Sequence, residues 1–332
     1  MQDRARFAAR ATRSGLRRYP RQLVRSLDPR ALREDEAGAA AAIGAGAAET
    51  TEALAGMTAT PLAAAWLGHG SVMASVGGHR VLVDPVFSQR IGVRVGRVIV
   101  GKTRVQPAPV AAEQLAPADL LLLTHAHFDH LDRPTLARLA HPLTHVLTAR
   151  HTARLVPAGF GSVRELHWGA SADVGGLQVS AVRPAHWGAR TVVDRRRGFN
   201  SYVVEAGGVR CLFAGDTAET DAFDALDPVD LAVFGIGAYD PWIHAHATPE
   251  QVWGMVRRLG ARWLLPVHHS TFVLSDEPLD EPMERLRAAA AGAGAGAGTK
   301  MERSMDVDDD GAIAANGPRI MPPILGAVGQ LD

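Results

Sequence analysis

The chain has 332 residues, of which 47% are hydrophobic and 21% charged, and its formal net charge is zero. This composition provides a core for one large or two ordinary globular domains. It excludes a membrane-spanning protein, because no stretch approaches the roughly 18 consecutive apolar residues of a span. The N-terminus lacks the hydrophobic segment of a signal peptide, so we expect a cytoplasmic protein. The only cysteine, Cys211, lies in an apolar run, which indicates a small core residue and excludes an internal disulfide.

Residues 1–57 are predicted to form an N-terminal extension, rich first in arginine and then in alanine and glycine. A basic arm of this kind is able to contact a membrane surface or nucleic acid. However, almost all basic residues of the whole chain are arginines, with Lys102 and Lys300 the only lysines, so the arginine bias is global. We therefore expect an ordinary extension, and peripheral membrane contact through the arm is the alternative.

The catalytic domain is expected over residues 58–288, and it opens with antiparallel strands. Three strand-like apolar runs cover residues 65–68, 72–76 and 80–84. Gly77-Gly78 between the last two runs is a hairpin signal. A fourth run, residues 119–123, follows Pro117 and predicts a buried strand, although periodicity alone does not separate it from a buried helical segment.

A cluster of potential metal ligands follows this fourth run directly: His125, His127, Asp129 and His130. Four such residues in six positions are hard to explain as packing. In extended backbone, residues two apart point the same way, so His125 and His127 converge on one ion. Asp129 and His130 lie where the chain turns, and they suit a second ion beside the first. Asp132 is then the predicted N-cap of a short helix.

Later strands end on further ligands in the same manner. Residues 177–182 precede His186, a hairpin over 202–205 and 209–214 precedes Asp216, and residues 262–267 precede His268. These side chains are therefore expected to meet at one edge of a sheet sandwich. The other histidines lack this context. His79, His141, His145, His151 and His167 are expected at the surface or in the core, whereas His69, His244, His246 and His269 lie close to candidate site loops and are undecided at this point.

The strongest helix prediction is Pro249–Leu259. Thr248 is its N-cap, Gln251 completes a capping box, and Gly260 ends the helix. Beyond about residue 288, alternating alanine and glycine and an acidic cluster predict a flexible low-complexity tail over residues 289–332.

Imidazole and carboxylate ligands together suit zinc, in preference to iron or manganese. Two ions about 3.5–4 Å apart clamp the attacking and leaving oxygens of a displacement and lower the pKa of a bound water to roughly 7. The sequence contains no G-x-S-x-G elbow and no G-x-G-x-x-G fingerprint that would compete for the chemistry. We therefore expect a hydrolase that uses a metal-bound hydroxide.

The order His125-x-His127-x-Asp129-His130, then His186, Asp216 in Gly-Asp-Thr and a late His268, resembles the metallo-β-lactamase superfamily. The resemblance covers roughly residues 63–287. It implies an α/β fold, a four-layer αββα sandwich with two mixed β-sheets and the metals at one edge. It also implies two Zn²⁺ per chain, the first held by His125, His127 and His186 and the second by Asp129, His130 and His268, with Asp216 as the bridge.

Several motifs further resemble the branch of N-acyl-phosphatidylethanolamine-hydrolysing phospholipase D: residues 66–71, 84–88, 184–187, 215–217, 236–241 and 266–268. This resemblance implies a phosphodiester substrate, either a small molecule or a phospholipid, with Asp129 and His246 as catalytic groups. An exposed loop histidine is the alternative for His246. The chain departs from that branch in a shorter loop over residues 241–246, in His269 in place of a tryptophan and in Phe128 in place of a tyrosine.

Other functions remain alternatives on the same residues. A lactonase-like or ribonuclease Z-like enzyme would keep the metals and change the substrate. Nucleic acid is not expected, because no compact basic patch with interleaved aromatics lies in the catalytic region. A noncatalytic scaffold would have lost a ligand, and none is missing. A redox di-iron role is disfavoured because the oxygen-reducing relatives have a carboxylate where this chain has His127. The sequence leaves a homo-oligomer open.

Overall fold

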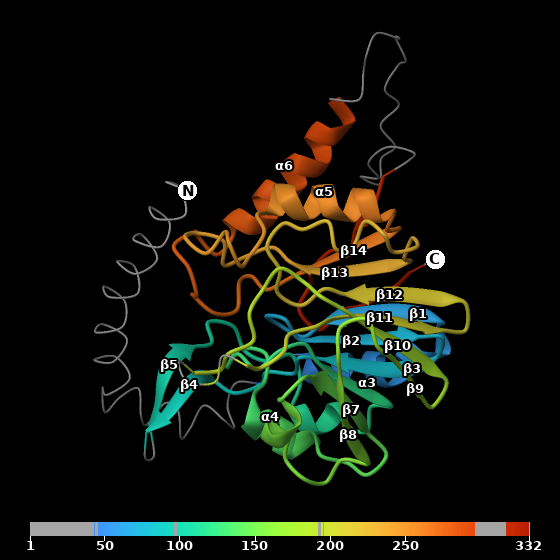
Figure 1. Ribbon diagram of the computed structural model, residues 1–332, viewed down its shortest axis with the longest axis vertical. Helices are drawn as coiled ribbons and strands as arrows, with labels where there is room; N and C mark the ends of the chain where they lie inside the picture. Colours follow the sequence, from blue (N-terminus) through green and yellow to red (C-terminus); the bar gives the residue numbers. More distant parts are fainter. Residues whose placement is uncertain are drawn as a thin grey trace.

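The computed structural model describes residues 43, 46–95, 98–191, 194, 196–295 and 317–331. These residues form two seven-stranded sheets that pack face to face, with helices on both outer faces (Figure 1). The predicted four-layer αββα sandwich is therefore confirmed. The arginine-rich part of the predicted arm lies outside the described residues, as do residues 296–316 of the predicted tail.

The first sheet has the strand order β16-β1-β2-β3-β6-β7-β8. Its strands are β1 (Leu62–Trp66), β2 (Val72–Val76), β3 (His79–Val83), β6 (Leu120–Leu123), β7 (His145–Ala149), β8 (Ser162–Leu166) and β16 (Val328–Gln330). Strands β16 to β3 pair antiparallel, whereas β3, β6, β7 and β8 are parallel. The predicted antiparallel opening and the strand before the histidine cluster are both present.

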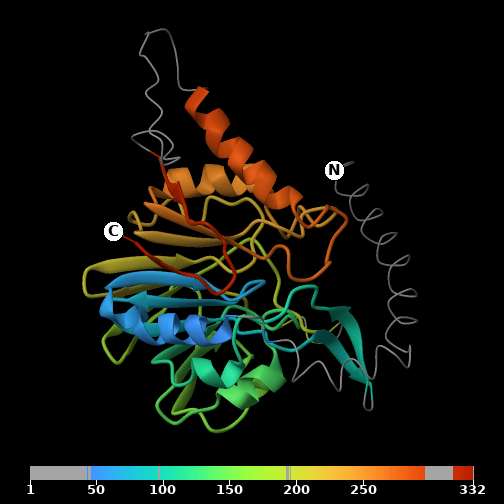
Figure 2. The same cartoon turned by 180° about the vertical axis from the view of Figure 1, so that it is seen from behind.

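The second sheet has the strand order β15-β14-β13-β12-β11-β10-β9. Its strands are β9 (Ser171–Val174), β10 (Leu177–Val182), β11 (Ser201–Ala206), β12 (Val209–Phe213), β13 (Leu231–Gly235), β14 (Trp263–Val267) and β15 (Arg319–Ile320). Strands β9 to β12 are antiparallel and β12 to β15 are parallel, so both sheets are mixed. A separate antiparallel hairpin, β4 (Arg90–Val95) and β5 (Val98–Thr103), projects from the sandwich (Figure 2).

Both predicted Gly-Gly hairpins form, because glycine accepts the left-handed backbone that a two-residue turn requires. Gly77 and Gly78 have φ values of 59° and 86°, and Gly207 and Gly208 have 57° and 80°. A Cβ on Gly77 would lie 2.5 Å from the carbonyl oxygen of Ala206. The two turns therefore contact each other across the sandwich, and a larger residue would force them apart.

The helices bury the outer faces of the two sheets. α3 (Ala47–Gly56) and α4 (Arg133–Leu139) cover the first sheet, and α5 (Pro249–Leu259) and α6 (Glu281–Ala295) cover the second (Figures 1 and 2). Short 3₁₀ helices are η1 (Met57–Ala59), η2 (Ala112–Leu115) and η3 (Ala153–Leu155). Because both faces of each sheet are covered, strands such as β2 and β6 are buried along their whole length. Cys211 is buried between the sheets, as predicted.

The helix predicted at Pro249–Leu259 has its predicted bounds and caps. Thr248 Oγ1 accepts a hydrogen bond from the Gln251 amide at 3.3 Å, and Gln251 Oε1 accepts one from the Thr248 amide at 2.9 Å. Gly260 ends the helix with a φ of 68°. This capping fixes where the preceding loop, which carries His246, meets the helix.

Asp132 occupies the predicted N-cap position of α4, but its side chain does not cap the helix. Asp132 Oδ2 accepts hydrogen bonds from Thr135 Oγ1 at 2.5 Å and from the Ser88 amide at 3.0 Å. The carboxylate therefore ties α4 to the loop after β3, next to the ligand cluster.

Both predicted ends of the catalytic domain need correction. α3 begins at Ala47, inside the predicted extension of residues 1–57, and buries Leu54 against the first sheet. α6 continues to Ala295, and β15 and β16 complete the two sheets, so the interpretation of residues 289–332 as a flexible tail is wrong for residues 289–295 and 317–331. Such short strands pair through backbone groups, which leaves little hydrophobic pattern in the sequence. No helix among the described residues is long and apolar enough to cross a membrane.

Candidate metal centre

Five segments that are far apart in the sequence bring polar side chains to one edge of the sandwich. The turn between β1 and β2 carries His69, the loop after β6 carries the cluster from His125 to His130, and the loops after β10, β12 and β14 carry His186, Asp216 and His268. The parallel pairing of β12, β13 and β14 places their strand ends at the same edge. All seven ligands predicted from the sequence lie in this group.

The first cluster consists of His125, His127, His186 and Asp216. His125 Nε2 lies 2.8 Å from His127 Nδ1, and His127 Nδ1 lies 3.4 Å from His186 Nε2. Asp216 Oδ2 lies 3.7 Å from both His125 Nε2 and His186 Nε2. Three ring nitrogens and one carboxylate oxygen therefore converge on a single point, as the ligands of a tetrahedral metal ion do.

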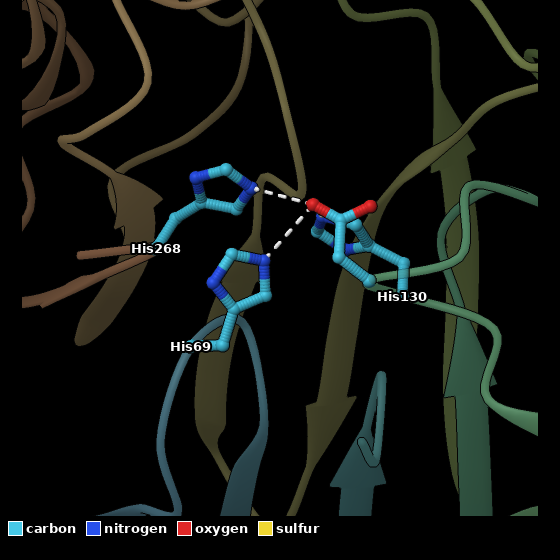
Figure 3. Close-up of side chains that lie close together, drawn as sticks. His69, His130 and His268 are labelled. Carbon is cyan, nitrogen blue, oxygen red and sulfur yellow. Dashed lines mark hydrogen bonds and ion pairs between the residues drawn. The ribbon is translucent and has the colours of Figure 1, made fainter. Parts of the chain in front are cut away.

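The second cluster consists of His69, Asp129, His130 and His268, and Figure 3 shows its three imidazole rings converging. Asp129 Oδ2 lies 3.0 Å from His69 Nε2, 3.5 Å from His268 Nε2 and 3.8 Å from His130 Nε2. Asp216 joins this cluster as well, at 3.1 Å from His130 Nε2 and 3.3 Å from His268 Nε2. Asp216 thus contacts ligand nitrogens of both clusters.

The donor atoms of these residues fit divalent cations. His130 Nε2, His268 Nε2 and Asp216 Oδ2 are buried and make no hydrogen bond to any described residue. A buried polar atom without a partner costs about 1–3 kcal/mol. Metal coordination would satisfy the two Nε2 atoms of the second cluster and the shared carboxylate at the same time, so the residues present fit a dinuclear centre.

The electrostatics of the edge also favour cations. Burial by itself raises the pKa values of Asp129 and Asp216, but His130 and the other neighbouring histidines together outweigh burial and hold both carboxyl pKa values well below their usual range. Burial lowers the pKa of His268, yet the carboxylates of Asp216 and Asp129 together raise it to about 9 overall. Burial holds the pKa of His125 well below its usual range, and the neighbouring imidazoles lower this pKa further. Two ionised carboxylates therefore require compensating positive charge here.

Groups behind the ligands fix the orientation of the rings. Asp84 Oδ2 accepts a hydrogen bond from His130 Nδ1 at 2.7 Å, which leaves His130 Nε2 free to ligate. Asp84 Oδ1 also accepts from the Thr124 amide at 2.8 Å, and the carbonyl oxygen of Ala245 accepts from His186 Nδ1 at 3.0 Å. Such partners set the tautomer and direction of a metal-binding histidine.

Two of the contributors were not assigned to the site from the sequence. The sequence places Asp84 only within the motif of residues 84–88 and does not decide whether His69 belongs to the site or to the core. The signal for both was the family resemblance, since each lies many residues from the ligand that it contacts.

His246 lies beside both clusters and belongs to neither set of four. Its Nδ1 is 3.9 Å from Asp216 Oδ2, and its ring centroid is 5.2 Å from those of His186 and His268. Burial lowers the pKa of His246 to about 4, so its ring is neutral at neutral pH. His244 in the same loop is exposed and stacks edge-on against Trp242 instead.

A cavity of about 930 Å³ opens beside the clusters. His127 and Asp129 contribute to its wall, and most of the remaining lining is apolar: Ile91, Val93, Val100, Phe128, Trp187, Ala189, Phe199 and Leu274. Of the two substituted positions noted in the sequence, only Phe128 lines this cavity. His269 stacks on Trp66 with 4.7 Å between ring centroids and lines a smaller pocket.

One basic residue of the cavity wall holds the ligand loop in place. Arg190 Nη1 donates hydrogen bonds to the carbonyl oxygens of Ala126 at 2.9 Å and Leu131 at 2.8 Å, and its guanidinium lies 3.9 Å from the Phe128 ring centroid. Burial lowers the pKa of Arg190 to about 10, so it stays charged at neutral pH. Arg190 therefore fixes both ends of the loop between His125 and Asp132.

The backbone is held in unusual conformations at the same edge. His69 and His268 have φ values of 52° and 62°, a region that residues other than glycine seldom adopt. The His268 amide donates to the His69 carbonyl oxygen at 2.9 Å, which links the two strained residues. A Cβ on Gly237 would lie 2.3 Å from the His268 carbonyl oxygen, so glycine is required there. Strain of this kind is typical of functional sites.

Comparisons with known proteins agree with this arrangement. Residues 79–269 match the beta-lactamase superfamily domain. An uncharacterized protein of Mycobacterium tuberculosis is 34% identical over 250 residues, which cover 70% of this chain and 64% of that protein. The chain thus spans less than two thirds of this relative's length. N-acyl-phosphatidylethanolamine-hydrolyzing phospholipase D 1 of Caenorhabditis elegans is 27% identical over 249 residues, 68% of this chain and 69% of that protein.

A solved structure shows the same fold. The crystal structure of a possible metal-dependent hydrolase from Veillonella parvula superposes with a TM-score of 0.56 at 14% identity, covering 82% of this chain and 100% of that chain. At this identity the likeness concerns the architecture, which is the sandwich described above.

Proposed function

Because the chain belongs to the beta-lactamase superfamily and its two ligand clusters share one carboxylate, we propose that it is a dinuclear zinc hydrolase that cleaves phosphodiesters. The observation that carries this proposal is the position of Asp216. Its two oxygens lie within 3.7 Å of nitrogens from His125 and His186 on one side and from His130 and His268 on the other. A carboxylate between two sets of imidazoles suits a bridge between two cations.

The ligand sets follow from the two clusters. His125, His127 and His186 would hold the first ion, Asp129, His130 and His268 the second, and Asp216 both. When bound, the two ions supply a water molecule of lowered pKa and stabilise negative charge on the phosphoryl oxygens. Several metals bind mixed nitrogen and oxygen ligands, and a ligand set made mainly of imidazoles suits zinc.

Two side chains act on the substrate directly in this proposal. His246 lies against both ligand clusters, and its neutral ring would donate a hydrogen bond to a phosphoryl or leaving oxygen as negative charge develops there. The ionised carboxylate of Asp129 lies in the cavity wall and accepts a proton from the attacking water. The buried surroundings strengthen both interactions because little bulk water screens them.

The phosphodiester class has two supports. The relative from Caenorhabditis elegans is a phospholipase D by name, and its likeness extends over most of this chain. The cavity beside the clusters is large and mainly apolar, which suits a substrate with a hydrophobic part joined to the phosphodiester. A lactonase-like substrate on the same metals is the alternative that the experiment below separates.

The test combines metal analysis with two substrates. Purified chain is expected to contain about two zinc ions and to hydrolyse a bis-aryl phosphodiester, with little turnover of a simple lactone. Turnover of the lactone alone would favour the alternative. Iron in place of zinc, together with an optical redox band, would contradict the proposal.

A further inference from the structure

His69 is a buried histidine that the proposed chemistry does not use. It is 1% exposed and lies in the turn between β1 and β2. The centroid of its ring lies 4.1 Å from that of the His268 ring (Figure 3). The Phe272 ring meets it edge-on, with 5.2 Å between the centroids. The side chain thus packs against the other residues of the second cluster on one side and against Phe272 on the other.

Both backbone polar groups of His69 make hydrogen bonds. Its amide donates to Thr271 Oγ1 at 2.7 Å, and its carbonyl oxygen accepts from the His268 amide at 2.9 Å and from Trp66 Nε1 at 2.7 Å. These bonds maintain a left-handed backbone that costs on the order of 1 kcal/mol or more in a residue other than glycine. Their combined effect is to fix the direction of the imidazole ring.

The ring points its Nε2 at Asp129 Oδ2, 3.0 Å away. The other close neighbours of this oxygen are His268 Nε2 at 3.5 Å and His130 Nε2 at 3.8 Å, which are both ligands of the second site. Because the other two neighbours of Asp129 Oδ2 would bind the metal, His69 is the one that can orient the carboxylate.

We propose that His69 is a positioning residue that donates its Nε2 hydrogen to Asp129 and thereby sets the affinity of the second metal site. This inference rests on the proposed dinuclear centre. Asp129, His130, His268 and the shared Asp216 already supply the four ligands that zinc prefers, so a fifth is not needed. The pair reverses the common arrangement in which a carboxylate orients a metal-binding histidine.

A pair of variants that differ by one methylene separates this role from coordination. Asparagine tolerates the left-handed backbone, but its amide is too short to reach Asp129. Glutamine extends an amide N–H to about the position of imidazole Nε2. His145→Asn is the matched control, because His145 starts β7 and bonds Ser162 Oγ at 2.9 Å, away from the ligands.

The measurement is a competitive Zn²⁺ titration against a chromophoric chelator, in which the wild-type chain is expected to show two binding steps. His69→Asn is expected to weaken one step about 10–100-fold and to leave the other unchanged, as loss of an outer partner does in other metal sites. His69→Gln is expected to recover most of that loss, and His145→Asn to bind both ions like the wild type.

Other outcomes would overturn the inference in distinguishable ways. Two unchanged steps in His69→Asn would exclude the positioning role and leave the proposed function intact. Equal losses in His69→Asn and His69→Gln would show that the imidazole itself coordinates the ion. A wild-type chain that binds fewer than two zinc ions would overturn the dinuclear centre and, with it, the role of His69.

Discussion

The two ligand clusters are held by different means. In the first cluster, His125 and His127 come from one loop and are two positions apart, and His186 donates a hydrogen bond to the backbone carbonyl of Ala245. In the second, side chains from distant segments support the ligands: Asp84 contacts His130, His69 contacts Asp129, and His268 has a left-handed backbone. The remote support of the first cluster is thus a backbone carbonyl, whereas that of the second cluster comes from side chains. Substitution of side chains that are remote in sequence from the ligands should therefore weaken metal binding at the second site and leave the first site unchanged.

Asp216 is shared by both clusters, so removing its carboxylate should weaken metal binding at both sites and not at one of them alone. Asp216→Asn is expected to lower kcat by about 10³-fold or more, because a two-metal clamp supplies several kcal/mol of stabilisation and an amide is a weak bridge. Metal analysis should find fewer than two ions per chain. Full activity and full zinc content would mean that Asp216 serves only the turn after β12.

His246 contacts both clusters, so its removal should affect chemistry without separating them. His246→Ala is expected to keep both ions and to lower kcat about 10²–10³-fold, with a much smaller change in KM. The exposed neighbour provides the control, since His244→Ala should change neither constant. A larger loss of activity in His244→Ala than in His246→Ala would show that the catalytic role belongs to His244 and not to His246.

Asp84→Asn tests whether the second cluster depends on remote support. If the new amide keeps its bond to the Thr124 amide, its NH₂ group faces His130 Nδ1 and drives the ring proton to Nε2, where the metal should bind. One Zn²⁺ binding step is expected to weaken about 10–100-fold. Asp119→Asn is the control and should titrate like the wild type, because Asp119 precedes β6 and accepts a hydrogen bond from the Arg80 amide near the start of β3. Equal affinities in Asp84→Asn and Asp119→Asn would show that the two clusters do not differ in this way.

The smallest expected effect concerns the backbone around His268. Gly237→Ala places a Cβ 2.3 Å from the His268 carbonyl oxygen, and the required shift should lower the free energy of unfolding by about 1–3 kcal/mol. Thermal unfolding should show a Tm several degrees lower. Gly292→Ala in α6 meets nothing within 4 Å and should be neutral or stabilising by about 0.5–1 kcal/mol. Equal Tm values for the two variants would contradict the strain at His268.

The same contrast explains which features were predictable from the sequence. Alternation over two residues, a Gly-Gly turn and a capping box are local patterns, so the pair of His125 and His127, both hairpins and the helix Pro249–Leu259 could be placed from sequence alone. The ligand set of the second site came from the family resemblance. Its supporting residues were not found, because the bonds from Asp84 and His69 join segments separated by 46 and 60 positions.

The ends of the domain were misplaced for a related reason. The pairing of β1 with β16 is made by backbone groups, for example at Ala64 and Gly329, and leaves no side-chain pattern to read. The N-cap of α4 shows the opposite case. Its position was predicted correctly, but the Asp132 carboxylate bonds Ser88 and Thr135 because tertiary partners outcompete the local cap.

The late strands β15 and β16 have a consequence for how the chain is made. Each completes one sheet, so β1 and β14 keep unpaired backbone edges until residues 319–330 have left the ribosome. At about 5–20 residues per second, β1 waits on the order of tens of seconds for its partner. Exposed strand edges invite pairing with other chains. Nascent chains stalled before residue 319 should therefore be more prone to aggregation and more dependent on chaperones than the finished protein.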